Sequence, residues 1–198
     1  MAEKKYTPMM QHYLKMKEEN PDSILFYRLG DFYEMFFEDA KLVSQELDLV
    51  LTGRSAGVEE KVPMCGIPFH AANSYIQRLV KKGYKVAICE QLEDPSSAKG
   101  LVDRGIIKII TPGTYMDATM DAKSTNYMAS CDVSSFEITV IYCELSTGEL
   151  KYQTLQRSLV ALQKALLEQN VSELVCPMTM DKKWMAALEE MDTICLLY

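Results

Sequence analysis

The stretch Leu25-Phe26-Tyr27-Arg28-Leu29-Gly30-Asp31-Phe32-Tyr33-Glu34 decides how the rest of the chain is interpreted. Its first five residues are mostly apolar and aromatic, which predicts a buried strand, and Gly30-Asp31 is a turn signal. After the turn, aromatic residues crowd around one acid, Glu34. In an extended backbone Phe32 and Glu34 point to the same side, because side chains alternate with a period of two. In a helix they would not share a face. The extended conformation therefore gives one aromatic ring and one carboxylate a common target.

The segments around this stretch predict a small α/β domain. Thr7-Pro8 starts a helix and Asn20-Pro21 stops it. The segment from Val62 to His70 holds two prolines and a glycine, which argue against both a helix and a central strand. It is expected to be an irregular loop, either tucked into the core or pressing on a partner. The remaining expected elements are helices over 38–47 and 71–82 and strands over 47–52, 84–89 and 104–111.

The second half of the chain predicts a separate unit. A strand over 136–143 is joined by the turn Ser146-Thr147-Gly148 to a return strand over 149–154. A hairpin followed by alternating helices and strands resembles ribonuclease-H-like topology, and the pattern stops partway. The expected elements after the hairpin are helices over 158–167 and 181–191 and strands over 173–176 and 193–197. The predicted boundaries are a first domain over 1–115, a linker over 116–128 and an incomplete second domain over 129–198.

Charge and cysteine usage restrict the class of protein. The net charge is −7, with 15 Lys and Arg against 16 Asp and Glu in residues 1–115 and 6 against 12 in residues 116–198. This asymmetry suggests two units with different duties. The six cysteines are scattered, which favours a reduced cytoplasmic protein and disfavours structural zinc. No apolar run approaches the ~20 residues of a membrane span, and no secretory signal is recognised. We therefore expect no membrane association.

Catalytic motifs are not found in the sequence. There is no phosphate-binding loop of the G-x-x-x-x-G-K-[ST] type, no G-x-G-x-x-G and no G-x-S-x-G. Asp31, Glu34 and Glu38 are close enough in sequence to suggest a structure-specific nuclease with Mg²⁺, and this is the main alternative. Against it, Glu38 and Asp39 lie at a helix start, where acids are favoured, and Asp31 fits a turn. We expect no catalytic residue and no metal site in this chain.

A binding role agrees better with these residues. Phe32 can stack on a flat partner, and base–aromatic stacking is worth ~1–3 kcal/mol. A glutamate beside DNA is repelled by phosphates, so Glu34 would serve selectivity rather than affinity. Arg54 and Arg104 are among the scattered cations that could meet phosphates. A core phenylalanine beside a surface glutamate remains a commoner explanation of the pair, and a protein–protein adaptor is a third possibility.

Several blocks of the sequence closely resemble the MutS family of bacterial DNA mismatch repair proteins. Gly30-Asp31-Phe32-Tyr33-Glu34 is similar to the Phe-x-Glu motif of that family. The resemblance covers residues 5–115 and continues more weakly through 145–149. The other blocks, in the family's order, are Phe26-Tyr27-Arg28, Leu51-Thr52-Gly53-Arg54, Pro63-Met64-Cys65-Gly66-Ile67-Pro68-Phe69-His70-Ala71, Ala87-Ile88-Cys89-Glu90-Gln91 and Ile110-Thr111-Pro112-Gly113-Thr114. One departure is Phe69, where the family usually has tyrosine.

The resemblance implies a mismatch-recognition domain over 1–115, followed by part of a ribonuclease-H-like connector domain. Phe32 would stack on a mispaired or unpaired base from the minor groove, and Glu34 would hydrogen-bond to it. The implied neighbours of this pair are Met64, Gly66 and Pro68, with Arg54 and Arg104 as phosphate contacts. The implied partner is mismatched duplex DNA. For the full-length family it also implies a homodimer, mismatch repair partner proteins, and a DNA-dependent ATPase using ATP and Mg²⁺. This chain would lack the ATPase part and would hold no cofactor.

Overall fold

A computed structural model describes residues 6–93, 102–115, 126–191 and 194–197. The chain forms two compact units, residues 1–110 and residues 111–198, and each is described by itself. Both units are mixed α/β, which confirms the predicted fold class. Most of the predicted linker over 116–128 lies outside the described residues, and the predicted domain boundaries stay a prediction. None of the helices in the described part of the chain has the length and apolarity needed to span a membrane.

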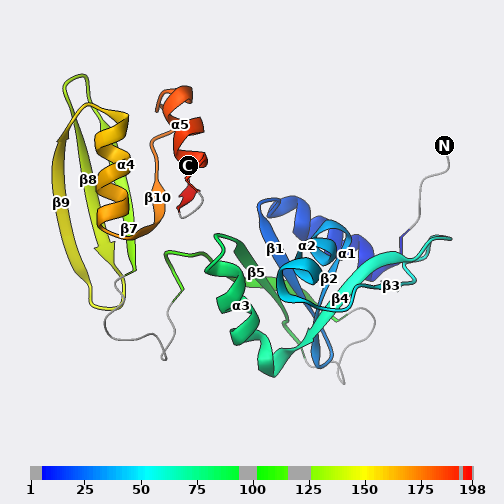
Figure 1. Ribbon diagram of the computed structural model, residues 1–198. Coiled ribbons are helices and arrows are strands. Elements are labelled where there is room, and N and C mark those ends of the chain that lie inside the picture. Colours follow the sequence, from blue (N-terminus) through cyan, green and yellow to red (C-terminus); the bar gives the residue numbers. More distant parts are fainter. Residues whose placement is uncertain (1–5, 94–101, 116–125, 192–193, 198) are drawn as a thin grey trace. The chain divides into compact units, whose positions relative to one another are not determined.

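In its described residues, the first unit holds a six-stranded sheet, three α-helices and one short 3₁₀ helix (Figure 1). The strand order is β3-β4-β2-β1-β5-β6, so β2 lies inside the sheet. The elements are α1 (Pro8–Glu19), β1 (Ser23–Leu29), β2 (Phe32–Phe36), α2 (Phe37–Leu47), β3 (Thr52–Arg54), β4 (Val62–Pro68), the 3₁₀ helix η1 (Phe69–Ala71), α3 (Ala72–Val80), β5 (Lys85–Gln91) and β6 (Arg104–Ile110).

The opening stretch folds as predicted into two strands and a turn. β1 pairs in antiparallel fashion with β2, and Tyr27 lies opposite Glu34. Gly30 in the turn has a φ of +58°, a left-handed conformation that glycine adopts without a steric penalty. The predicted start of α1 is also confirmed, because the Thr7 side chain accepts a hydrogen bond from the Met10 amide at 3.4 Å. Both the strand–turn–strand unit and the start of α1 thus follow from neighbouring residues in the sequence.

α1 packs on one face of this sheet and forms a buried cluster there. Tyr27 of β1 belongs to this cluster, so the α1 face of the sheet is the face that also carries Glu34. The main buried members from α1, β1, β2 and β5 are Met10, Tyr13, Leu25, Tyr27, Phe36, Ala87 and Cys89. The burial of these side chains stabilises β2 from the face that also carries Glu34.

The prediction of an irregular loop over Val62–His70 is wrong for its greater part. Residues 62–68 form β4, which pairs with β3 over 62–64 and with β2 over 64–68. Pro63 therefore has only β3 beside it, and Pro68 only β2. Each proline lies where one edge of the strand has no partner, so the missing N–H leaves no ladder bond unmade. The strand continues through the glycine at 66, opposite Glu34.

The predicted strand over 47–52 is also wrong. α2 continues to Leu47, and Asp48 closes it in the left-handed conformation with a φ of 56°. Only Thr52–Arg54 pairs, as the short edge strand β3. The alternation of apolar residues between Leu47 and Thr52 reflects a helix end followed by an irregular connection.

The second unit is a five-stranded sheet of order β11-β10-β7-β8-β9. The strands β7, β8 and β9 are antiparallel neighbours, while β10 and β11 continue the sheet in parallel pairing. The elements are β7 (Tyr127–Val133), β8 (Glu137–Glu144), β9 (Glu149–Gln156), α4 (Leu159–Glu168), β10 (Val171–Val175), α5 (Lys182–Glu189) and β11 (Cys195–Leu197). The ribonuclease-H-like identity of this unit stays a prediction.

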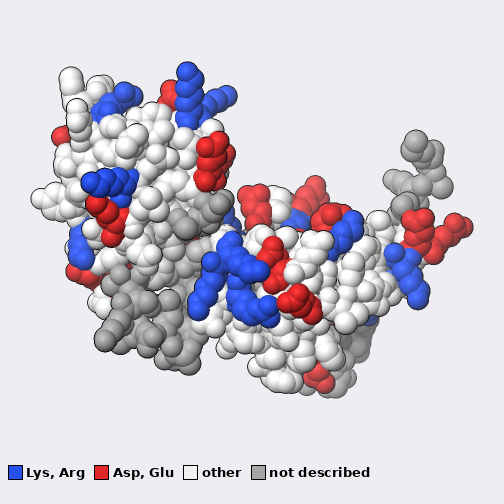
Figure 2. All heavy atoms as spheres, viewed as in Figure 1, with Lys and Arg blue, Asp and Glu red and all other residues white. Residues whose placement is uncertain are grey.

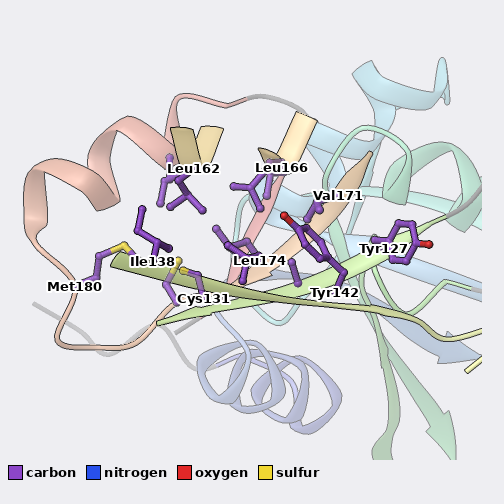
Figure 3. Close-up of a cluster of buried hydrophobic side chains, with 14 residues drawn as sticks. Tyr127, Cys131, Ile138, Tyr142, Leu162, Leu166, Val171, Leu174 and Met180 are labelled. Atoms are coloured by element: carbon purple, nitrogen blue, oxygen red, sulfur yellow. The ribbon is translucent and has the colours of Figure 1, made fainter. Parts of the chain in front are cut away.

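β7 was not expected from the sequence, yet it lies between β8 and β10. Its residues Tyr127, Ala129 and Cys131 alternate into the core of the unit. Figure 3 shows Tyr127 and Cys131 with leucines of α4 and with Ile138 and Tyr142 of β8, and all belong to one cluster. Small residues such as alanine and cysteine gave no strong strand signal, because their contribution here comes from burial rather than from intrinsic preference.

The Pro112-Gly113 turn is held by a buried acid of the second unit. The amide of Gly113 donates a hydrogen bond to Glu173 Oε2 at 2.9 Å, and Glu173 is fully buried. A Cβ atom at position 113 would lie 2.7 Å from the Cβ of Glu173. The close approach requires glycine at this position.

Candidate nucleic-acid interface

Six of the seven predicted binding residues come from β2, β3 and β4 and lie together on one face of the first sheet. In the β2–β4 ladder, Phe32 lies opposite Pro68 and Glu34 opposite Gly66. Directly paired residues of neighbouring strands share a face. Met64 and Arg54 belong to the same face, through the further pairs Phe36–Met64 and Arg54–Val62. The structure thus assembles residues that are up to 36 positions apart in sequence.

Phe32 is a surface residue. Its side chain is 48% exposed, although it belongs to an interior strand whose next residue, Tyr33, is buried. The explanation of the pair as a core phenylalanine beside a surface glutamate is therefore wrong for Phe32. A half-exposed phenyl ring at the turn end of β2 leaves one part of its surface free for a flat partner.

Glu34 forms an ion pair with Arg54, whose Nη1 donates to Glu34 Oε2. The side chain of Glu34 is 15% exposed and that of Arg54 is 36% exposed. The carboxylate is thus mostly covered, and its charge is balanced from β3. Sequence reasoning did not predict this pairing, because it depends on β4 lying between β2 and β3.

Arg104 lies on the same face, but its guanidinium is buried. Its Nε donates to the carbonyl of Arg28 and its Nη1 to the carbonyl of Val102, both at 2.9 Å, and it lies over the ring of Tyr27. Only 7% of the residue is exposed. This geometry gives Arg104 a role in holding β6 against β1 and does not support the predicted phosphate contact.

A second group of residues at the same turn was missed by sequence reasoning. The guanidinium of Arg28 lies 3.7 Å from the ring centre of Phe69, which is 40% exposed, and Arg28 also pairs with Glu90 at 3.4 Å. The Tyr33 hydroxyl donates to Glu90. Burial is the largest cause, and the hydrogen bond to Glu90 the second, of a pKa of Tyr33 that is raised to about 12. The hydroxyl therefore remains a donor at neutral pH. These partners are too far apart in sequence for any spacing rule to connect them.

The three acids of the nuclease alternative do not share a site. Glu34 pairs with Arg54, and Glu38 pairs with Lys41 at 2.7 Å in the first turn of α2. Asp31 lies in the turn, where its carbonyl accepts from the Phe69 amide at 2.9 Å. Within the described ranges, no three His, Cys, Asp or Glu side chains gather as they would around a metal ion. Figure 2 shows acidic and basic side chains interspersed among uncharged ones on the face that it presents.

The fold and the site together define a class of α/β recognition module, in which an exposed aromatic ring and an ion-paired glutamate share one sheet face. The family model for MutS domain I matches residues 7–119. The chain is 54% identical over 177 residues to the DNA mismatch repair protein MutS of Clostridium botulinum (strain Loch Maree / Type A3), covering 84% of this chain and 19% of that protein. It is 58% identical over 146 residues to the protein of the same name from Clostridium tetani (strain Massachusetts / E88), covering 73% and 17%.

The chain therefore belongs to the MutS family. It spans about a fifth of the length of the curated relatives that it matches. The matched domain contains the whole candidate interface, from Phe32 to Pro68.

Proposed function

We propose that the first unit recognises mispaired or unpaired bases in duplex DNA from the minor groove, as the first step of DNA mismatch repair. Phe32 stacks on the base and Glu34 hydrogen-bonds to it. The relatives that this chain resembles are named DNA mismatch repair proteins. The observation that carries the residue-level proposal is that the exposed ring of Phe32 and the carboxylate of Glu34 lie two residues apart on one face of β2.

The surroundings of Phe32 support a stacking role. Pro68 lies directly across from it on β4, and Gly66 lies across from Glu34. Neither residue carries a long side chain, and both are partly exposed. A base can therefore approach the ring without displacing a large side chain from the neighbouring strand. The burial of the phenyl ring and a base against each other would supply the free energy of stacking.

The test replaces Phe32 by alanine in a full-length MutS protein that contains these residues. The measured quantity is the ratio of the affinities for a duplex with one unpaired base and for the matched duplex. Phe32→Ala should lower this ratio by roughly 5- to 150-fold, as the stacking energy predicts. Fluorescence anisotropy at one fixed salt concentration measures both dissociation constants. Phe32→Trp, which keeps a flat ring, should restore most of the preference.

Phe136→Ala is the matched control, because it removes a phenyl ring that is 88% exposed in the second unit. It should leave the preference unchanged. A Phe32→Ala protein that is folded and still prefers the unpaired base would refute the proposal.

A further inference from the structure

Arg54 reaches Glu34 across an intervening strand. It belongs to β3, Glu34 belongs to β2, and β4 lies between these strands. The residue of β4 opposite Glu34 is Gly66, which has no side chain to fill the space beside the carboxylate. A Cβ atom there would already lie 3.5 Å from Glu34 Cγ. Arg54 itself lies opposite Val62, four residues before Gly66 along β4, so its side chain reaches Glu34 diagonally across the middle strand.

The ion pair fixes the direction of the carboxylate. One oxygen of Glu34, Oε2, is held by Arg54. A guanidinium presents its donors in a rigid planar fork, so a carboxylate that it binds loses rotational freedom. Within the described part of the chain, no residue donates a hydrogen bond to the other oxygen, Oε1. This oxygen remains an acceptor on the same face as Phe32.

The balance of charge matters because the partner proposed above is a polyanion. A bare carboxylate near DNA is repelled by the phosphates. An arginine whose charge is already engaged by a carboxylate contributes less to a phosphate contact than a free one would. Arg54 is therefore better placed to neutralise Glu34 than to bind a phosphate of the DNA backbone on its own.

We propose that Arg54 is a positioning and specificity-determining residue: it orients Glu34 toward the base and cancels its charge, rather than anchoring a phosphate. This inference rests on the proposed function and extends it to a residue that touches no base. It requires that Arg54 acts through Glu34, so the effect of losing Arg54 must depend on Glu34.

A double-mutant cycle tests this dependence in the same full-length protein. Arg54→Met should lower the ratio of affinities for unpaired-base and matched duplex by about two- to fivefold, the range expected for a partly exposed ion pair. In the Glu34→Gln background, Arg54→Met should leave the ratio of the two affinities unchanged within about 1.5-fold, because no charge on residue 34 remains to be balanced. Affinities measured over a series of salt concentrations give the salt slope.

A phosphate contact predicts a different result. Arg54→Met would then weaken binding to both duplexes equally in both backgrounds and would reduce the salt slope by about one. That outcome overturns the proposal. Arg78→Met is the matched control, because Arg78 is an exposed arginine on α3, away from the ion pair. If Arg54→Met does not fold, Arg54→Lys, which keeps the positive charge, should lower the ratio less than Arg54→Gln does, and equal ratios for these two also overturn the proposal.

Phe32→Ala in the same series distinguishes failure of the Arg54 proposal from failure of the proposed function. Loss of preference with Phe32→Ala, combined with no Glu34-dependent effect of Arg54→Met, overturns the role of Arg54 alone. Preference that survives Phe32→Ala overturns the proposed function itself.

Discussion

Asp39 connects more of the first unit than its place at the start of α2 suggests. Its carboxylate is buried, accepts a hydrogen bond from the Leu25 amide at 2.9 Å and pairs with Lys17 Nζ at 2.9 Å. The Tyr13 hydroxyl lies 3.4 Å from it. Sequence reasoning gave this acid only a favourable position in the field of the helix N-terminus. The structure shows one carboxylate joining α1, β1 and α2.

Asp39→Ala should destabilise the first unit strongly. It leaves the Leu25 amide without its acceptor and the Lys17 ammonium, which also donates to the Ser23 carbonyl at 2.7 Å, without its carboxylate. Loss of one member of a buried pair lowers stability by about 3 kcal/mol or more. Hydrogen exchange of the β1 amides, followed by mass spectrometry against urea concentration, measures the change in the unit concerned.

Glu38→Ala is the control for that experiment. Glu38 is the neighbouring acid of the same helical turn, but its side chain is 84% exposed and pairs only with Lys41. Its loss should change stability by no more than about 0.5 kcal/mol. Equal effects of the two substitutions would show that Asp39 acts only as a helix-start acid.

Among the elements, the β8–β9 hairpin is closed by a single acid. The Glu144 carboxylate accepts hydrogen bonds from the hydroxyls and amides of Ser146 and Thr147. The Thr147 hydroxyl first, and then that of Ser146, lower the pKa of Glu144 to about 2. The turn depends on this carboxylate being ionised.

The pH dependence of the second unit follows from this shift. The pKa of Glu144 is lower in the folded state than the ordinary value of about 4.3, so its contribution to stability is complete above that ordinary value. The contribution should be lost as the pH falls from about 4.5 to about 2. Urea unfolding monitored by fluorescence of Trp184, the one tryptophan, should show this loss in the wild type and a flatter profile in Glu144→Gln.

Glu137→Gln is the matched control, because Glu137 is an exposed glutamate of the same strand. It should keep the wild-type slope. A Glu144→Gln profile parallel to the wild type between pH 4.5 and 2 would contradict the assigned role of the turn.

Elements were predictable where their signals are local. The Thr7 cap, the Gly30 turn and the alternation from Phe32 to Glu34 depend on neighbouring residues, and all three are found as expected. β4 and β7 were missed because their identity depends on the strands beside them. Pro63 and Gly66 in β4 are weak strand residues that two distant partners hold in place.

The site was predictable to the same extent. Periodicity placed Phe32 and Glu34 on one side, and the resemblance brought Met64, Gly66 and Pro68 beside them. The pairing of Glu34 with Arg54 and the burial of Arg104 could not be derived, because both follow from the strand order of the folded sheet.

At the scale of the whole molecule, the net charge predicts a low affinity for DNA. The chain has a net charge of −7, and Arg54 and Arg104 are both engaged within the protein. Nonspecific binding depends on the number of phosphates neutralised. We expect the 198-residue chain alone to bind a short duplex no more tightly than about 10 μM at physiological salt, with a shallow salt slope.

Anisotropy titrations of the chain and of a full-length MutS protein, with the same labelled duplex, measure this difference. The full-length protein should bind more tightly and with a steeper salt slope. Submicromolar binding by the chain alone would mean that its surface makes more phosphate contacts than its charges indicate.

The interior position of β2 has a mechanical consequence. From Phe32 to Glu34 the strand is paired with β1 on one side and with β4 on the other. A ring and a carboxylate carried on such a strand cannot shift toward a target without breaking two ladders. In the proposed complex the duplex would have to adjust instead, and bending a site of 20–30 base pairs requires about 1–6 kcal/mol. Binding to this rigid strand would therefore depend on how easily each DNA step deforms. A base pair that is already poorly stacked would require the least deformation energy.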